Sequence, residues 1–159
     1  MDIKSIGFKR AVDANGIVRY KDAKMPVYST GKSAGADFFC AERVVIPSIW
    51  RLDGRGLAPT LVHTGISIKM RDDEVLNLYN RSGGPKRGLV LANGVGVVDA
   101  DYYDANGEIM FSFYNFSKDD LVIEVGDKIG QGVLCKFLQA QGAERLNVER
   151  SGGFGSTGM

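Results

Sequence analysis

The sequence predicts an all-β fold, a barrel or sandwich of short strands. Apolar residues recur at every second position in several short runs, glycine-containing turns separate these runs, and no stretch of about 12 residues carries a helical apolar stripe. Glycine accounts for 21 of 159 residues and proline for only 4. The glycines therefore mark turns and close backbone approaches rather than a disordered chain.

Four segments, 65–70, 108–115, 121–125 and 129–137, show the alternation of half-buried strands, in which successive side chains face opposite sides. The apolar side chains expected to share the buried faces are Ile66, Ile68 and Met70; Ile109, Phe111 and Phe113; Leu121, Ile123 and Val125; and Ile129, Val133, Cys135 and Phe137. In the second segment, the side chains expected on the opposite face are Glu108, Ser112 and Tyr114.

Turn signals separate these strands, and at most one short helix is expected. Asn106-Gly107 and Gly126-Asp127 are typical of turns. The short helix fits between Ser82 and Asn93, with Pro85 in its first turn.

Size and charge indicate one domain and exclude several classes of protein. A chain of 159 residues with a net charge of +1 and mixed signs throughout lacks the basic character of most duplex-binding domains. We expect no direct binding to nucleic acid, no membrane span and no signal peptide. Cys40 and Cys135 are too few for a disulfide framework, which is typical of a cytoplasmic protein.

The residues also restrict the chemistry. The single histidine, His63, precedes an apolar run and is typical of a strand-edge residue, so general-base work is expected from a carboxylate. The segment 94–98 has two glycines but lacks the third glycine and the helix of a dinucleotide-binding fingerprint.

Two segments suit a phosphorylated ligand. Arg81-Ser82-Gly83 offers a guanidinium, a hydroxyl and an unhindered amide. Asp99 and Asp101, two residues apart, project to one side of an extended chain, and burial at the end of an apolar strand would raise the basicity of Asp99. The glycine-rich end, 151–159, is either a disordered tail or an arm that carries Phe154 as an aromatic lid.

Taken in chain order, five segments resemble the five motifs of the homotrimeric dUTPase family (deoxyuridine 5′-triphosphate nucleotidohydrolases). The segments are 33–38, 81–83, 93–102, 126–131 and 152–158. The resemblance extends from Met25 to Gly158, over four-fifths of the chain.

The resemblance implies a jelly-roll-like barrel over 1–149 and an arm over 150–159 that closes over the active site. It implies a homotrimer with active sites at subunit interfaces. It also implies hydrolysis of dUTP to dUMP and pyrophosphate with Mg²⁺, which limits uracil incorporation into DNA and supplies dUMP for dTMP synthesis. The Mg²⁺ would be held by the triphosphate and waters, with no direct protein ligand.

The same resemblance assigns roles to residues. Asp99 would orient and deprotonate the attacking water, and Tyr102 would pack under the deoxyribose and exclude a 2′-hydroxyl. The residues expected to bind substrate are Arg81, Ser82, Gly83, Asn93, Val97, Val98, Tyr102, Met110, Gln131, Arg150, Phe154, Gly155, Ser156 and Thr157. Supporting roles are expected for Asp37, Asp101 and Asp127.

Three features depart from the common family pattern. The turn at 103–106 is longer than in the shortest members and resembles a subgroup of some bacteria and their phages, in which case the host cytoplasm is the expected location. Arg150 stands one residue closer to Phe154 than usual, so Arg145 competes with it as the γ-phosphate ligand. Asn80 stands where a proline is common.

Two alternatives differ in class. A dCTP deaminase shares the fold but needs a glutamate base and a serine-rich second motif. A regulatory protein that binds a partner and uses dUTP as its switch would use arm closure as a two-state element.

Overall fold

Short strands make up nearly all of the regular structure in this computed structural model, which describes residues 6–51, 57–146, 148–150 and 153. The strands are β1 (Gly7–Arg10), β2 (Val27–Tyr28), β3 (Gly35–Phe39), β4 (Val44–Ile46), β5 (Thr60–Lys69), β6 (Glu74–Tyr79), β7 (Leu89–Leu91), β8 (Gly96–Val98), β9 (Ile109–Asn115), β10 (Leu121–Ile123) and β11 (Lys128–Lys136). In this part of the chain, the helical segments are single 3₁₀ turns: η2 (Ile49–Arg51), η3 (Pro85–Arg87) and η4 (Ala100–Tyr102). The all-β prediction is confirmed.

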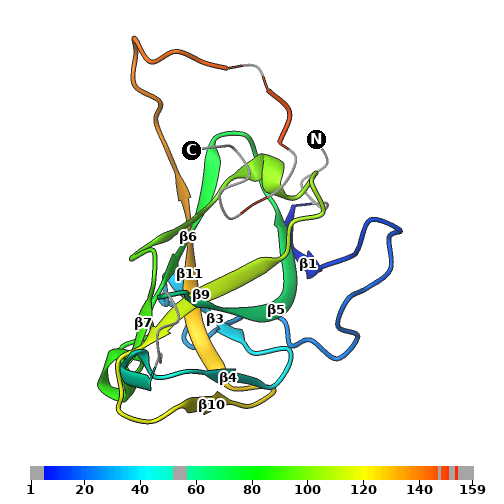
Figure 1. The fold of residues 1–159 in the computed structure, drawn as a ribbon. Coiled ribbons are helices and arrows are strands. Elements are labelled where there is room, and N and C mark those ends of the chain that lie inside the picture. The colour runs from blue at the N-terminus through cyan, green and yellow to red at the C-terminus, as the bar shows by residue number, and fades with distance from the viewer. Residues whose placement is uncertain (1–5, 52–56, 147, 151–152, 154–159) are drawn as a thin grey trace.

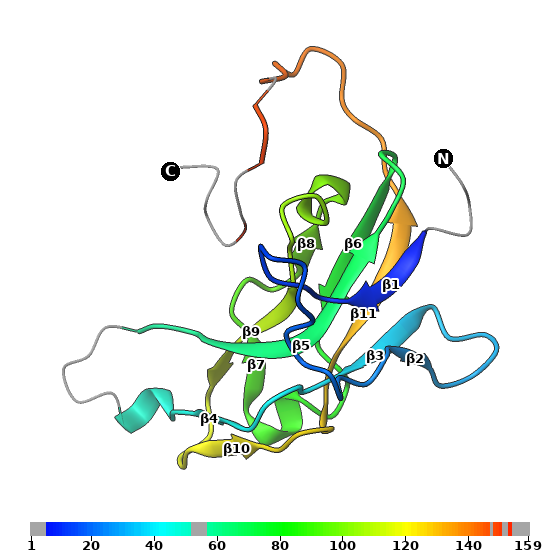
Figure 2. The ribbon, with the colours of Figure 1, turned by 90° about the vertical axis from the view of Figure 1, so that its right-hand side faces the viewer.

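The strands form two main sheets and a separate ribbon. One sheet has the order β1-β5-β9-β7, the other has the order β2-β3-β11-β6-β8, and β4 pairs with β10 in the ribbon. All these pairings are antiparallel. The ribbon lies at one end of the molecule, and the segment that follows β11 arches away from the opposite end (Figures 1 and 2).

Aromatic rings fill the core between the two main sheets. Phe38 of β3 and Phe111 of β9 are fully buried, with ring centroids 5.6 Å apart. A Cβ atom on Gly130 of β11 would lie 2.0 Å from the ring of Phe111, so glycine leaves the space that this ring occupies. This contact is one of the close backbone approaches that the glycine content predicts.

The predicted buried faces are confirmed in β5 and β9 and are partly wrong elsewhere. Ser112 of β9 and Glu108, which directly precedes β9, were expected on the outer side of this strand and are also buried. Val125 lies beyond β10 in the turn and is 62% exposed. Phe137 likewise follows the end of β11 and is 37% exposed.

Local backbone signals agree with the observed turns. Asn106 and Gly126 both have positive φ, at 53° and 86°. The predicted short helix is only the 3₁₀ turn η3, with Pro85 in its first turn, because the chain enters β7 at Leu89. Among the described residues, no helix has the length and apolar character needed to cross a membrane.

His63 lies inside a strand rather than ahead of one. β5 begins at Thr60, and His63 pairs with Met110 of β9 just before the register shifts. The strand is longer than predicted. Residues 60–63 do not alternate cleanly between polar and apolar side chains, so the sequence did not indicate a strand there. They nevertheless pair with β9.

Candidate functional site

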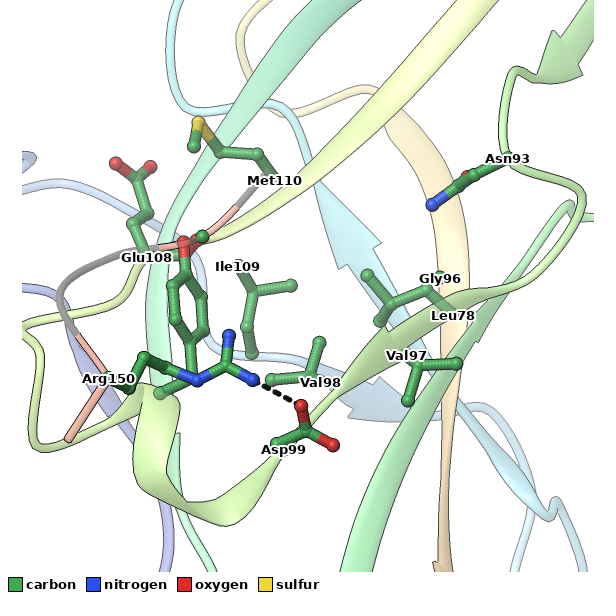
Figure 3. Close-up of a pocket in the computed structure, with 12 residues that line it drawn as sticks. Leu78, Asn93, Gly96, Val97, Val98, Asp99, Glu108, Ile109, Met110 and Arg150 are labelled. Carbon is green, nitrogen blue, oxygen red and sulfur yellow. Dashed lines mark hydrogen bonds and ion pairs between the residues drawn. The ribbon is translucent and has the colours of Figure 1, made fainter. Parts of the chain in front are cut away.

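A cavity of about 190 Å³ opens where β8, η4 and β9 meet (Figure 3). It is lined by Leu78, Asn93, Gly96, Val97, Val98, Asp99, Tyr102, Glu108, Ile109, Met110, Arg150 and Gly153. The third predicted motif, Met110 and Arg150 are therefore brought together in one place.

Asp99 lies at the rim of this cavity because β8 ends at Val98. Its backbone is still extended, with φ −80° and ψ 158°, and the 3₁₀ turn η4 follows at once. Asp101 lies within that turn rather than on an extended chain, which corrects the predicted local geometry. The two carboxylates nevertheless lie close enough for one side chain to bind both.

Arg150 is that side chain. Its Nε donates to Asp101 at 2.8 Å, and its Nη2 forms an ion pair with Asp99. The Arg150 side chain is only 18% exposed, whereas that of Asp99 is 52% exposed. The predicted desolvation of Asp99 therefore does not arise within the single chain.

Tyr102 forms one wall of the cavity. Its hydroxyl donates to the backbone carbonyl of Glu108 at 2.9 Å, and burial together with the negative charge of Glu108 raises its pKa. The Arg150 guanidinium lies 5.8 Å from the centre of the Tyr102 ring, within cation–π range. A Cβ atom on Gly153 would lie 2.7 Å from that ring, so the start of the arm packs directly on Tyr102.

A second group of predicted residues gathers around Asp37 on β3. Arg81 Nε and Lys128 Nζ bind the Asp37 carboxylate at 3.0 and 2.8 Å, and the hydroxyl of Ser29 donates to it at 2.9 Å. Burial opposes ionisation of Asp37, but the hydrogen bonds from Lys128 and Ser29 and the charge of Arg81 outweigh it and lower the pKa. Asp37 thus holds two cations in place.

Gln131 lies beside this group and contacts the segment before Arg81. Its Nε2 donates to the carbonyl of Asn80 at 3.0 Å. It also packs against Gly35 of the first motif, where a Cβ atom would lie 2.7 Å from the Gln131 side-chain oxygen. The first, second and fourth motifs therefore meet at this end of the β3-β11-β6 sheet.

The two groups lie far apart on one chain. Leu76 of β6 pairs with Val98 of β8, so Asp99 is level with Val75. Arg81 follows Val75 by six residues, which corresponds to about 20 Å of extended chain. An arginine side chain does not span this gap, so one chain alone does not bring Arg81 to Asp99.

Other predicted residues have separate positions. Ser82 and Gly83 are exposed at the turn before η3, and Arg145 is exposed in the segment after β11. Asp127 accepts a hydrogen bond from the Glu124 amide at 3.0 Å and so stabilises the turn before β11. Phe154, Gly155, Ser156 and Thr157 lie outside the described residues.

Three residues of these two groups were not predicted from the sequence as site residues. Glu108 was expected only on the outer face of a strand, although its place two residues before Met110 puts both on the cavity side. Lys128 stands inside the fourth motif, which was the available signal for it. Ser29 carried no signal in the sequence.

The described residues contain no group of three or more histidine, cysteine, aspartate or glutamate side chains that could hold a metal ion. The carboxylates nearest the cavity, Asp99 and Asp101, are engaged by Arg150.

Most of this chain matches one known protein family. The dUTPase family model matches residues 21–158. The deoxyuridine 5′-triphosphate nucleotidohydrolase of Lactococcus lactis is 42% identical over 152 residues, which cover 89% of this chain and 94% of that protein.

Solved structures show the same fold. The dUTPase from Streptococcus mutans superposes with a TM-score of 0.73 at 36% identity and covers 86% of this chain and 99% of its own. A mutant dUTPase from phage phi11 of S. aureus, which coordinates a structural Mg(II) ion, has a TM-score of 0.66 at 20% identity, with 84% and 96% coverage. The family model and the relatives agree, and the chain belongs to the dUTPase family.

Proposed function

We propose that this protein hydrolyses dUTP to dUMP and pyrophosphate, with Asp99 as the base that activates the attacking water. The observation that carries the assignment is the position of Asp99 at the rim of the cavity formed by β8, η4 and β9, beside Tyr102. Membership of the dUTPase family supports the substrate.

In this mechanism, Asp99 accepts a proton from a water molecule that attacks the α-phosphorus. The bond from that phosphorus to the α–β bridging oxygen breaks, and pyrophosphate leaves. A carboxylate must be free to accept that proton. Because Arg150 pairs with Asp99 in the free chain, substrate binding must exchange this contact for water.

The cavity is suited to a pyrimidine deoxynucleoside. Asn93, Val97 and Val98 line the side of the cavity that would face the uracil edge, and Tyr102 would lie under the deoxyribose. A closely fitting polar site rejects a wrong base because the mismatched ligand leaves buried groups unpaired.

Mg²⁺ is proposed as the cofactor, bound by the triphosphate and waters. Once bound, it neutralises part of the triphosphate charge. Arg81, Ser82, Gly83 and Gln131 would supply the remaining phosphate contacts, and Asp37 keeps the Arg81 guanidinium in position.

The separation of Arg81 from Asp99 supports a site shared between subunits. We propose a homotrimer in which Arg81, Ser82, Gly83 and Gln131 of one subunit complete the cavity around Asp99 of its neighbour. A cyclic trimer repeats this head-to-tail contact three times and closes.

The arm 150–159 is proposed to close over the bound nucleotide. Its first residues already lie at the cavity, where Arg150 and Gly153 contact η4. On closure, Arg150 would move from the two aspartates to the γ-phosphate, and Phe154 would stack on uracil. A base–aromatic stack contributes about 1–3 kcal/mol.

The test mixes purified protein and Mg²⁺ with each deoxynucleoside triphosphate and separates the products by anion exchange. Conversion of dUTP alone to dUMP and pyrophosphate is expected. Deoxyuridine nucleotides from dCTP would indicate a deaminase instead, and no turnover of any substrate by a folded protein would contradict catalysis.

A further inference from the structure

The single histidine of the chain, His63, forms a partly buried pair with Glu108 behind the cavity wall. Its Nδ1 lies 3.1 Å from Glu108 Oε2 and donates to it, because a carboxylate oxygen accepts. The Glu108 side chain is only 3% exposed. A carboxylate so buried depends on its hydrogen-bond donors.

A backbone amide supplies the other donor to Glu108. Gly65 N–H donates to Glu108 Oε1 at 2.8 Å. This amide points at the carboxylate because the β5–β9 register shifts between His63 and Ile66, and Gly65 has φ +67°. The Glu108 side chain is therefore held from two positions on β5.

Glu108 in turn holds Tyr102. The Tyr102 hydroxyl donates to the Glu108 carbonyl at 2.9 Å, and the Gly107 amide donates to the Tyr102 carbonyl at 2.8 Å. A Cβ atom on Gly107 would lie 2.5 Å from the Tyr102 ring, so the ring rests directly on this backbone. Movement of Glu108 would carry the ring with it.

The far side of His63 is also occupied. Glu42 Oε1 lies 3.8 Å from His63 Nε2, and the Tyr20 ring lies 5.7 Å from the imidazole centre. Burial, followed by the charges of Glu42 and Glu108, raises the pKa of Tyr20 to about 12, so its phenol is neutral at ordinary pH. The imidazole is thus fixed between two carboxylates and a ring.

We propose that His63 is a positioning residue which, through Glu108, sets the place of the Tyr102 ring and thereby the selection of deoxyribose over ribose. The inference rests on the proposed function, in which Tyr102 packs under the sugar. His63 touches no substrate itself. Its effect should appear as a change in sugar selectivity rather than as a general loss of activity.

The experiment compares kcat/KM for dUTP with kcat/KM for UTP in four proteins that differ at one position. His63→Ala should lower the dUTP/UTP ratio about 10-fold, because small displacements of positioning groups have effects of this size or more. His63→Asn places an amide donor near the Nδ1 position and should restore most of the ratio. His63→Gln places its amide on the opposite side, toward Glu42, and should resemble His63→Ala.

Leu61→Ala is the matched control, since Leu61 lies on the same side of β5 and is partly exposed like His63. It should leave the ratio unchanged. In a Tyr102→Phe background, His63→Ala should cause little further loss, because coupled residues do not add. The thermal unfolding midpoint of each variant reports whether it is folded.

The outcomes separate the inference from the function. Wild-type preference for dUTP over UTP, together with an unchanged ratio in folded His63→Ala and His63→Gln, would overturn the inference alone. Equal losses on dUTP and UTP would also overturn it, as an ordinary structural effect. No turnover by the wild type would contradict the proposed function itself.

Discussion

Asp37 illustrates at the residue scale how one buried carboxylate organises a binding group. It lies in the first motif, yet its partners come from the second and fourth motifs and from Ser29. The motif pattern indicated that Asp37 matters, whereas its partners follow only from the pairing of β3 with β2 and β11 and of β11 with β6.

Asp37→Asn should reduce stability at neutral pH by about 1–3 kcal/mol, because Arg81 and Lys128 would lose their charged acceptor. The folded-state pKa of Asp37 is lowered from its ordinary 3.8. The carboxylate therefore contributes stability above pH 3.8 that is lost as the pH falls through the lower folded-state value. Urea unfolding between pH 2 and 7 should show the wild-type advantage disappear at acid pH, and a pH-independent difference would contradict this account.

Asp99→Asn should keep the fold and the binding of nucleotide but lower turnover by about 10²–10⁴-fold. The asparagine retains the size of the side chain and removes the proton acceptor. Single-turnover kinetics would measure the loss of turnover, and binding of a non-hydrolysable dUTP analogue would measure the retained affinity for nucleotide. Near-normal turnover would contradict the assignment of the base.

Packing between the strands depends on glycine where an aromatic ring lies directly against the backbone. Gly130→Ala in β11 should lower the free energy of unfolding by about 1–3 kcal/mol, because the added methyl overlaps the Phe111 ring in the core. Gly31→Ala is the control, since no atom lies within 4 Å of its Cβ position. Equal unfolding midpoints for the two variants would show that the strands and rings shift freely.

At the scale of elements, the chain beyond β11 is the segment with the clearest separate role. Deleting residues 151–159 should reduce activity strongly while leaving the oligomer intact, because the barrel strands end at Lys136. Steady-state kinetics and light scattering on the same sample would measure both. An unaffected rate would mean that this segment is only a tail.

At the scale of the whole molecule, the two groups of site residues predict an assembly. The particle should be a trimer of 17.2 kDa chains. Arg81→Ala and Asp99→Asn subunits, each inactive alone, should regain activity when co-assembled, because about one third of the shared sites in a mixed trimer would then contain both native residues. Co-expression with two affinity tags isolates the mixed particles, and inactive mixed trimers would show that each site lies within one chain.

A regulatory partner is a separate prediction at this scale. A pulldown from host lysate, with and without a non-hydrolysable dUTP analogue, tests it. Retention of no protein under either condition would remove the partner and leave the catalytic assignment intact.

Period-two alternation and turn signals by themselves determined the all-β class, the buried faces of β5 and β9 and the turns at Asn106 and Gly126. These features depend on neighbours in the chain, so a local pattern contains them. The ordered motifs likewise indicated Asp99, Tyr102 and Arg81 as functional residues.

Only the tertiary structure decided which of these residues meet. Strand register puts Asp99 and Arg81 at opposite ends of β6, and the bulge in β5 directs His63 and Gly65 onto Glu108. Arg150 reaches Asp99 across 51 positions in sequence. Such contacts arise from pairing and packing between distant segments, and no local spacing encodes them.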